Sequence, residues 1–89
     1  MSFYMINYDL VQPGQNYDNL IKSIKSYSAW CHVLESCWIV KSDLQPSSIR
    51  DALAQYLDAN DKILVIKVSV PAAWRGLSKG VSDWIKDNL

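Results

Sequence analysis

The sequence predicts an α+β protein: a ferredoxin-like βαββαβ antiparallel sheet with a C-terminal helical extension. Segments rich in β-branched and aromatic residues alternate with segments of helical periodicity, and their order along the chain is β-α-β-β-α-β. The chain has 89 residues, which is the size of a single domain. We expect residues 1–70 to form the ferredoxin-like domain and residues 71–89 to form a helical extension packed on that domain.

The first half of the chain contains a predicted strand, helix and hairpin. Residues 3–9 alternate β-forming types and lead into VQPGQN, in which Pro13-Gly14 suits a type II turn. Residues 29–41 are too rich in β-branched and aromatic types for a helix, so we expect a bent hairpin with strands at 30–34 and 36–41. Between them, Asn16 is a suitable N-cap for a helix with one apolar face: Tyr17, Leu20, Ile21, Ile24 and Tyr27.

The second half repeats the pattern of a helix followed by a strand. Pro46 suits the first position of a helix, and residues 62–70 form a β-branched run that is apolar on both faces. Pro71 ends that strand, and a last amphipathic helix is expected to start near Ser78. The apolar face of the second helix consists of Ile49, Ala52, Leu53, Tyr56 and Leu57.

Both faces of the predicted sheet are apolar. In the third strand Cys37 and Ile39 share one face, and Trp38 and Val40 share the other. Two helices cover only one face of a four-stranded sheet, so the C-terminal segment, a second subunit or both must cover the other. A two-fold homodimer is the default partner for an uncharged apolar patch.

Charge and cysteine usage restrict the classes of function. Nine basic and nine acidic residues give a formal net charge of zero, which argues against a histone-like nucleic-acid binder. No apolar run approaches the ~20 residues of a membrane span, and the first residues lack the features of a signal peptide. We therefore expect a cytoplasmic protein without a membrane partner, in which Cys31 and Cys37 are reduced thiols.

The end of the first strand carries a family resemblance. A hydrophobic strand that ends in Tyr8-Asp9, followed by a loop and a helix, resembles the CRISPR-associated protein two family and the virulence-associated protein D family. The resemblance extends to about residue 70 and includes the bent hairpin around Ser36. It implies a ferredoxin-like homodimer related to metal-dependent nucleases of defence systems, in which Asp9 binds Mg²⁺ or Mn²⁺, and Tyr8 and Ser36 position an RNA or DNA substrate.

A dimer gives Asp9 a physical reason to bind metal. Mg²⁺ usually takes one or two carboxylates together with waters and phosphate oxygens, and a nearby two-fold axis supplies the second carboxylate from the same gene. The metal then polarises a phosphoryl oxygen and activates a water for in-line attack. The alternative is that Asp9 accepts backbone N–H bonds in the following turn.

The chain departs from those nucleases in its basic residues. Members that handle nucleic acid carry arginines near the first loop and the second strand, where this chain has Gln12, Gln15 and His32; its arginines are Arg50 and Arg75. The lysines are better explained as a solvated surface than as a phosphate-binding patch. These lysines are Lys22, Lys25, Lys41, Lys62 and Lys67.

Other residues that resemble functional sites have simpler structural explanations. His32 lies in an apolar strand, and the cysteines lack the spacing and the four ligands of a structural zinc site. Residues 58–61 offer oxygen donors but lack the length and glycine of an EF-hand, so we expect a turn. Trp74 and Trp84 are expected to pack in the core or at a dimer interface rather than to stack on bases.

The sequence leaves two classes of function open. The first is a metal-dependent endonuclease or endoribonuclease that acts on RNA or DNA as a homodimer. The second is a catalytically inactive dimeric module that binds a partner protein or nucleic acid. A third, by fold analogy, is a small-ligand sensor built on the dimer interface.

Overall fold

The computed structural model describes residues 1–11 and 17–89, so the predicted Pro13-Gly14 turn and the Asn16 cap lie outside the described residues. The elements follow the predicted order and confirm the α+β class. In chain order they are β1 (Ser2–Asp9), α1 (Asp18–Lys25), β2 (Ala29–Leu34), β3 (Cys37–Ser42), α2 (Pro46–Ala54), β4 (Lys62–Val68) and α3 (Lys79–Asn88).

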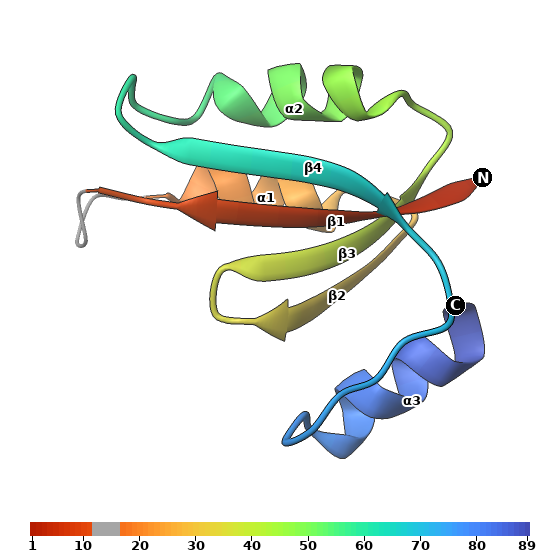
Figure 1. Ribbon diagram of the computed structural model, residues 1–89. Helices are drawn as coiled ribbons and strands as arrows, with labels where there is room; N and C mark the ends of the chain where they lie inside the picture. Colours follow the sequence, from red (N-terminus) through yellow and green to blue (C-terminus); the bar gives the residue numbers. More distant parts are fainter. Residues whose placement is uncertain (12–16) are drawn as a thin grey trace.

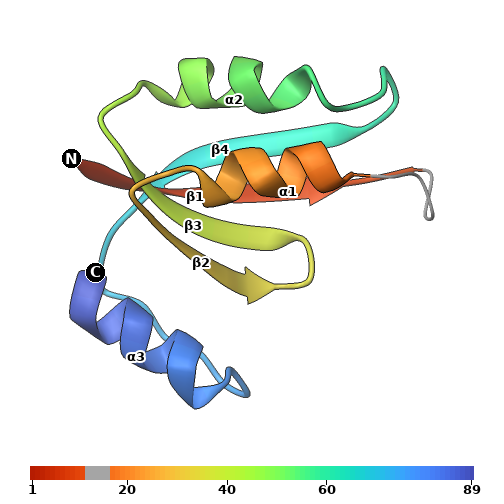
Figure 2. The same cartoon turned by 180° about the vertical axis from the view of Figure 1, so that it is seen from behind.

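The four strands form one antiparallel sheet in the order β2-β3-β1-β4 (Figure 1). β1 is central: Met5 lies opposite Ile39 of β3 on one side and opposite Ile66 of β4 on the other. The β2–β3 pairing shifts register between His32 and Leu34, as the predicted bend in the hairpin requires. The view from behind shows α1 in front of β1, so this face of the sheet is the helix-covered face (Figure 2).

Strand alternation decides which side chains enter the core. Tyr4 and Ile6 of β1 lie beside Val40 and Trp38 of β3, and all of them face the two helices. Trp38 and Ile6 are 1% and 0% exposed. The core cluster is completed by two residues from each helix: Leu20 and Ile24 of α1, and Ile49 and Leu53 of α2.

Local signals fix the ends of the helices. Pro46 is in the first turn of α2, where its missing N–H costs no hydrogen bond. The Ser78 side chain accepts a hydrogen bond from Val81 N–H at 3.2 Å and caps α3. α1 ends at Lys25 and α2 ends at Ala54, so the predictions that Tyr27 belongs to the first helix and that Tyr56 and Leu57 belong to the second are wrong. All three residues follow their helix and pack partly buried against the core.

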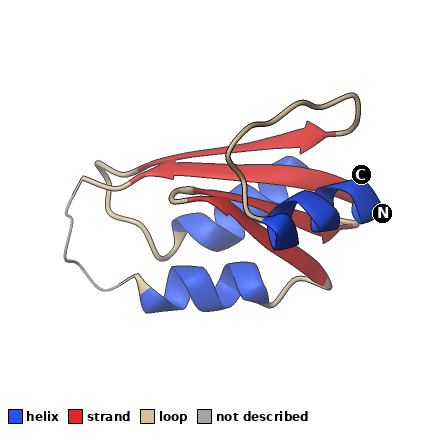
Figure 3. Cartoon of the chain, turned by 90° about the horizontal axis from the view of Figure 1, so that it is seen from below, coloured by secondary structure: helices blue, strands red, loops and turns tan. Residues whose placement is uncertain are grey.

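The C-terminal segment, residues 69–89, lies against the second face of the sheet. Figure 3 shows α1 on one side of the strands and the loop that follows β4 on the other. α3 contacts β2, and Trp84 meets the Phe3 ring edge to face at 5.9 Å. Gly76 in the loop has φ 83°, a left-handed conformation that favours glycine.

This segment covers only part of the second face. On the β2–β3 side, Cys31, Cys37 and Ile39 are buried. On the β1–β4 side, Leu64 and Ile66 remain 56% and 47% exposed. We call the exposed area around Leu64 and Ile66, bordered by Met5 and Asn7 of β1, the open patch.

Candidate functional site

The three predicted site residues lie at one end of the sheet. Tyr8 and Asp9 close β1, and Ser36 is in the turn between β2 and β3. The backbone N–H of Tyr8 donates to the carbonyl oxygen of Ser36 at 3.1 Å, so these two residues are held together. Strand alternation turns the Tyr8 and Asp9 side chains to opposite faces of the sheet. The side chains of Tyr8 and Asp9 therefore do not point toward the same substrate position within one chain.

The Tyr8 side chain has a structural partner. Its hydroxyl accepts a hydrogen bond from the indole N–H of Trp38 at 3.0 Å. Trp38 is buried in the core, and an unpaired buried indole N–H would destabilise the fold. This bond accounts for a tyrosine at position 8 without a catalytic role.

Asp9 is exposed at the edge of the open patch, beside a cation. It pairs across the strands with Lys62 of β4, and both side chains face the side of the sheet that carries Leu64. A shallow hollow of about 250 Å³ lies here and is lined by Asn7, Tyr8, Asp9, Lys62, Ile63 and Leu64. Within residues 1–11 and 17–89, no hydrogen bond or ion pair holds the Asp9 carboxylate.

The turn after β1 is held by a different carboxylate. Asp61, just before β4, accepts hydrogen bonds from the backbone N–H of Val11 at 2.9 Å and of Asp58 at 2.8 Å. Its other contact is the Tyr17 hydroxyl, at 3.1 Å. For the Val11 N–H, the turn acceptor is therefore Asp61 and not Asp9, while residues 12–16 of this turn lie outside the described residues. The residue types at 58–61 predict a turn, but they carry no signal for a contact with a residue 50 positions away.

These bonds shift two pKa values in opposite directions. The N–H groups of Val11 and Asp58 stabilise the charged carboxylate and lower the pKa of Asp61. Burial, followed by the hydrogen bond to Asp61, raises the pKa of Tyr17. Asp61 thus ties Val11 to the start of β4 more strongly when it is charged than when it is protonated.

We expect Asp61→Asn to lower the melting temperature at pH 7, because the amide keeps the size of the side chain but not its charge. A folded-state pKa below the unfolded value means that the stabilisation is complete above the unfolded pKa and is lost as pH falls through the folded pKa. Thermal melts from pH 7 to pH 2 should show the difference from wild type shrinking with acidity. Asp87→Asn, an exposed change in α3, is the matched control. A difference that stays constant over this range would contradict the assignment.

Metal coordination by a single chain has little support at Asp9. Among residues 1–11 and 17–89, no group of three or more His, Cys, Asp or Glu side chains could hold a metal ion. One exposed carboxylate next to a lysine is a weak Mg²⁺ ligand set. The residues fit a divalent cation only if a second chain contributes another carboxylate.

The histidine and the cysteines have structural roles. The His32 ring stacks on Trp38 with centroids 3.8 Å apart, and its Nε2 lies 3.0 Å from the Glu35 carbonyl oxygen. Cys31 and Cys37 are buried and are not joined by a disulfide. Burial raises the pKa of both, and for Cys37 the proximity of Cys31 adds to the effect. Neither is poised as a nucleophile.

The predicted C-terminal tryptophans pack within the fold. Trp74 donates its indole N–H to the Ser82 hydroxyl at 3.0 Å, which joins the loop to α3. Trp84 packs on Phe3, as described above. The interpretation of these indoles as packing residues is thus confirmed for both.

The comparisons add no family to these observations. No protein-family model matches the chain, and a search of curated proteins found no significant match. Among the described residues, no helix is both long enough and apolar enough to cross a membrane.

Proposed function

We propose that this chain is a ferredoxin-like interaction module that works as a two-fold symmetric homodimer. The observation that carries the proposal is the open patch. Leu64 and Ile66 stand next to each other on one face of β4, and both are about half exposed, whereas Cys31, Cys37 and Ile39 on the β2–β3 side of the same face are buried. Exposed apolar area on a sheet face is typical of an interaction surface. The strand order β2-β3-β1-β4, with one helix after β1 and one after β3, supports the ferredoxin-like assignment.

The charges beside the patch favour a second copy of the same chain as the partner. Asp9 and Lys62 lie side by side at one end of the patch, with opposite charges. In a two-fold interface every contact occurs twice, so Asp9 of each chain can meet Lys62 of the other. A surface that carries one acid and one base beside an apolar centre is therefore complementary to itself.

The charge pair can be tested by reversal. We expect the wild type to sediment as a dimer, Asp9→Lys to weaken the dimer by about tenfold or more because two like-charge contacts form, and the double variant Asp9→Lys/Lys62→Asp to recover it. Sedimentation equilibrium over a range of concentrations, at low and high salt, measures all three. A monomeric wild type overturns the proposal. If the double variant does not recover the dimer, Asp9 and Lys62 do not pair across the interface, although the apolar patch could still form it.

A metal-dependent endonuclease is the second candidate, and one observation favours it. The Asp9 carboxylate is exposed at the end of β1, and within residues 1–11 and 17–89 no hydrogen bond or ion pair holds it; the Val11 amide binds Asp61 instead. In a dimer that places the two Asp9 carboxylates together, Mg²⁺ or Mn²⁺ would have two carboxylates and open positions for phosphate and water. Ser36 lies in an exposed turn at the same end of the sheet, where its hydroxyl would help to position RNA or DNA.

Cleavage of labelled single-stranded RNA and double-stranded DNA tests this candidate. The nuclease proposal predicts cleavage by wild type with Mg²⁺ or Mn²⁺, none with EDTA, and none by Asp9→Ala in either metal. Asp87→Ala controls for the loss of an exposed carboxylate elsewhere. An unchanged melting temperature of Asp9→Ala shows that the loss is catalytic. No cleavage by wild type at high enzyme concentration would rule this candidate out and leave the interaction module.

A further inference from the structure

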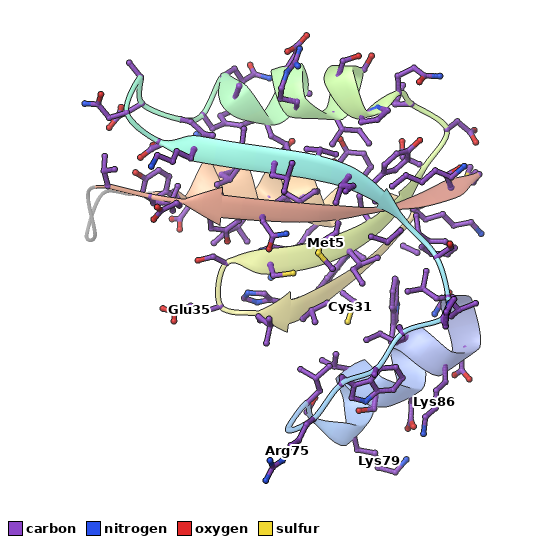
Figure 4. All side chains as sticks on the ribbon, in the orientation of Figure 1. Met5, Cys31, Glu35, Arg75, Lys79 and Lys86 are labelled. Carbon is purple, nitrogen blue, oxygen red and sulfur yellow. The ribbon has the colours of Figure 1, made fainter. Side chains whose placement is uncertain are left out.

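A cavity of about 560 Å³ lies between the sheet and the C-terminal segment. One wall is the second face of the sheet, including Met5 and Ile39, and the other is formed by the segment, including Trp74, Leu77 and Ile85. Small-molecule sites in proteins usually have volumes of roughly 300 to 1,000 Å³, so this cavity is large enough to hold a ligand. In Figure 4 Met5 and Cys31 mark the sheet side of this region, with the segment below them.

One contact joins the C-terminal segment to the sheet, and another stiffens the segment itself. Near the end of α3, Trp84 packs on Phe3 and Ile85 is 5% exposed. Within the segment, the hydrogen bond from the Trp74 indole to the Ser82 hydroxyl joins the loop to the first turn of α3. The segment is therefore anchored to the sheet near the end of α3 and stiffened near its loop. The cavity lies between the segment and the sheet.

The lining determines the chemistry of a ligand. The walls are mostly apolar, and Asn7 of β1 brings a side-chain amide into this lining. Among the described residues, no hydrogen-bond partner is found for that amide. Arg75 is the cation at the rim, but Figure 4 shows its side chain extending away from the sheet. The lining is thus mostly apolar, with Asn7 and Ser69 as its neutral hydrogen-bonding residues and Arg75 as its one charged residue, whose side chain extends away from the sheet.

We infer that this cavity binds a small neutral molecule with an apolar body and one hydrogen-bonding end, the latter at Asn7. An amide both donates and accepts, so it can pair with a hydroxyl, a carbonyl or an amide. A charged end would lose its hydration without gaining a counter-ion, and an isolated buried charge is costly. Both walls belong to one chain, so this inference goes beyond the proposed dimer and does not depend on it.

The neutral dye N-phenyl-1-naphthylamine, whose fluorescence rises in apolar surroundings, is a direct probe. We expect saturable binding to the full chain, displacement by 1-octanol, and displacement by octanoate that is about tenfold weaker or more, because the carboxylate meets no cation. Asn7→Leu should weaken 1-octanol binding by about fivefold, which is the value of one net neutral hydrogen bond.

Two variants fill the cavity from opposite walls. Met5→Trp from the sheet and Ala73→Trp from the segment should each abolish binding of the dye, whereas Ala54→Trp on the exposed side of α2 should not. Melting curves show which variants are folded, and the segment variant keeps the test valid if Met5→Trp does not fold. Absence of saturable binding to wild type, or binding that survives in the folded cavity-filling variants, overturns the inference. Binding that appears only in a monomeric open-patch variant would show that a second copy occupies the cavity, and would also overturn it.

Discussion

Trp38→Ala is expected to lower the free energy of unfolding by about 3 to 5 kcal/mol, the usual cost of removing a large aromatic side chain from a core. Trp38 is 1% exposed, and it lies where the helix-covered face meets the β2 edge. The substitution removes the stack with His32 and the hydrogen bond to Tyr8 along with the buried area. A chain of this size is stabilised by only about 4 to 13 kcal/mol, so the variant would lose much of its stability.

Urea unfolding measures this loss, and two variants separate its causes. Tyr8→Phe leaves the indole in place but removes its acceptor, which should cost about 1 to 3 kcal/mol for an unpaired buried donor. Trp30→Ala removes a neighbouring indole that is 38% exposed and 5.8 Å from Trp38, so it should cost less than Trp38→Ala. An equal loss for the two tryptophan variants would show that Trp38 is not the centre of the core.

Alternation along β3 is the part of the fold that the sequence predicted best. It assigned Trp38 and Val40 to one face and Cys37 and Ile39 to the other, and the register with β1 confirms both pairs. This works because a strand turns every second side chain to the same face, whatever its distant partners are. The periods of the helices and the Pro46 start are local signals of the same kind.

Contacts between distant segments could not be predicted in this way. Nothing near Asp61 indicates that its carboxylate binds Val11 and Tyr17, because the sheet pairing of β1 with β4 brings these residues together. The same pairing places Lys62 beside Asp9, which the motif at the end of β1 does not reveal. The candidate site was therefore predicted by its residue but not by its neighbours.

Lys62 distinguishes the two proposed roles of Asp9. A cation next to a carboxylate competes with a bound divalent metal, whereas it completes an ion pair with a partner chain. Removal of the Lys62 charge should therefore strengthen metal binding if the nuclease proposal holds, and weaken the dimer if the interaction module holds. In both proposals the protein is a dimer, and the open patch is the surface that the two chains are proposed to bury.

Leu64→Lys/Ile66→Lys is expected to convert the dimer to a monomer over the micromolar concentration range. Burying a leucine or isoleucine side chain contributes about 1.5 to 3 kcal/mol, and each substitution acts twice in a symmetric interface, so the dissociation constant should rise by on the order of 1,000-fold or more. Both side chains are already about half exposed in the single chain, so the melting temperature of the isolated fold should change little. Leu44→Lys is the matched control, since Leu44 is 48% exposed before α2 and lies outside the patch. Sedimentation that gives the same dimer for the patch variant and for the control would contradict the proposed interface.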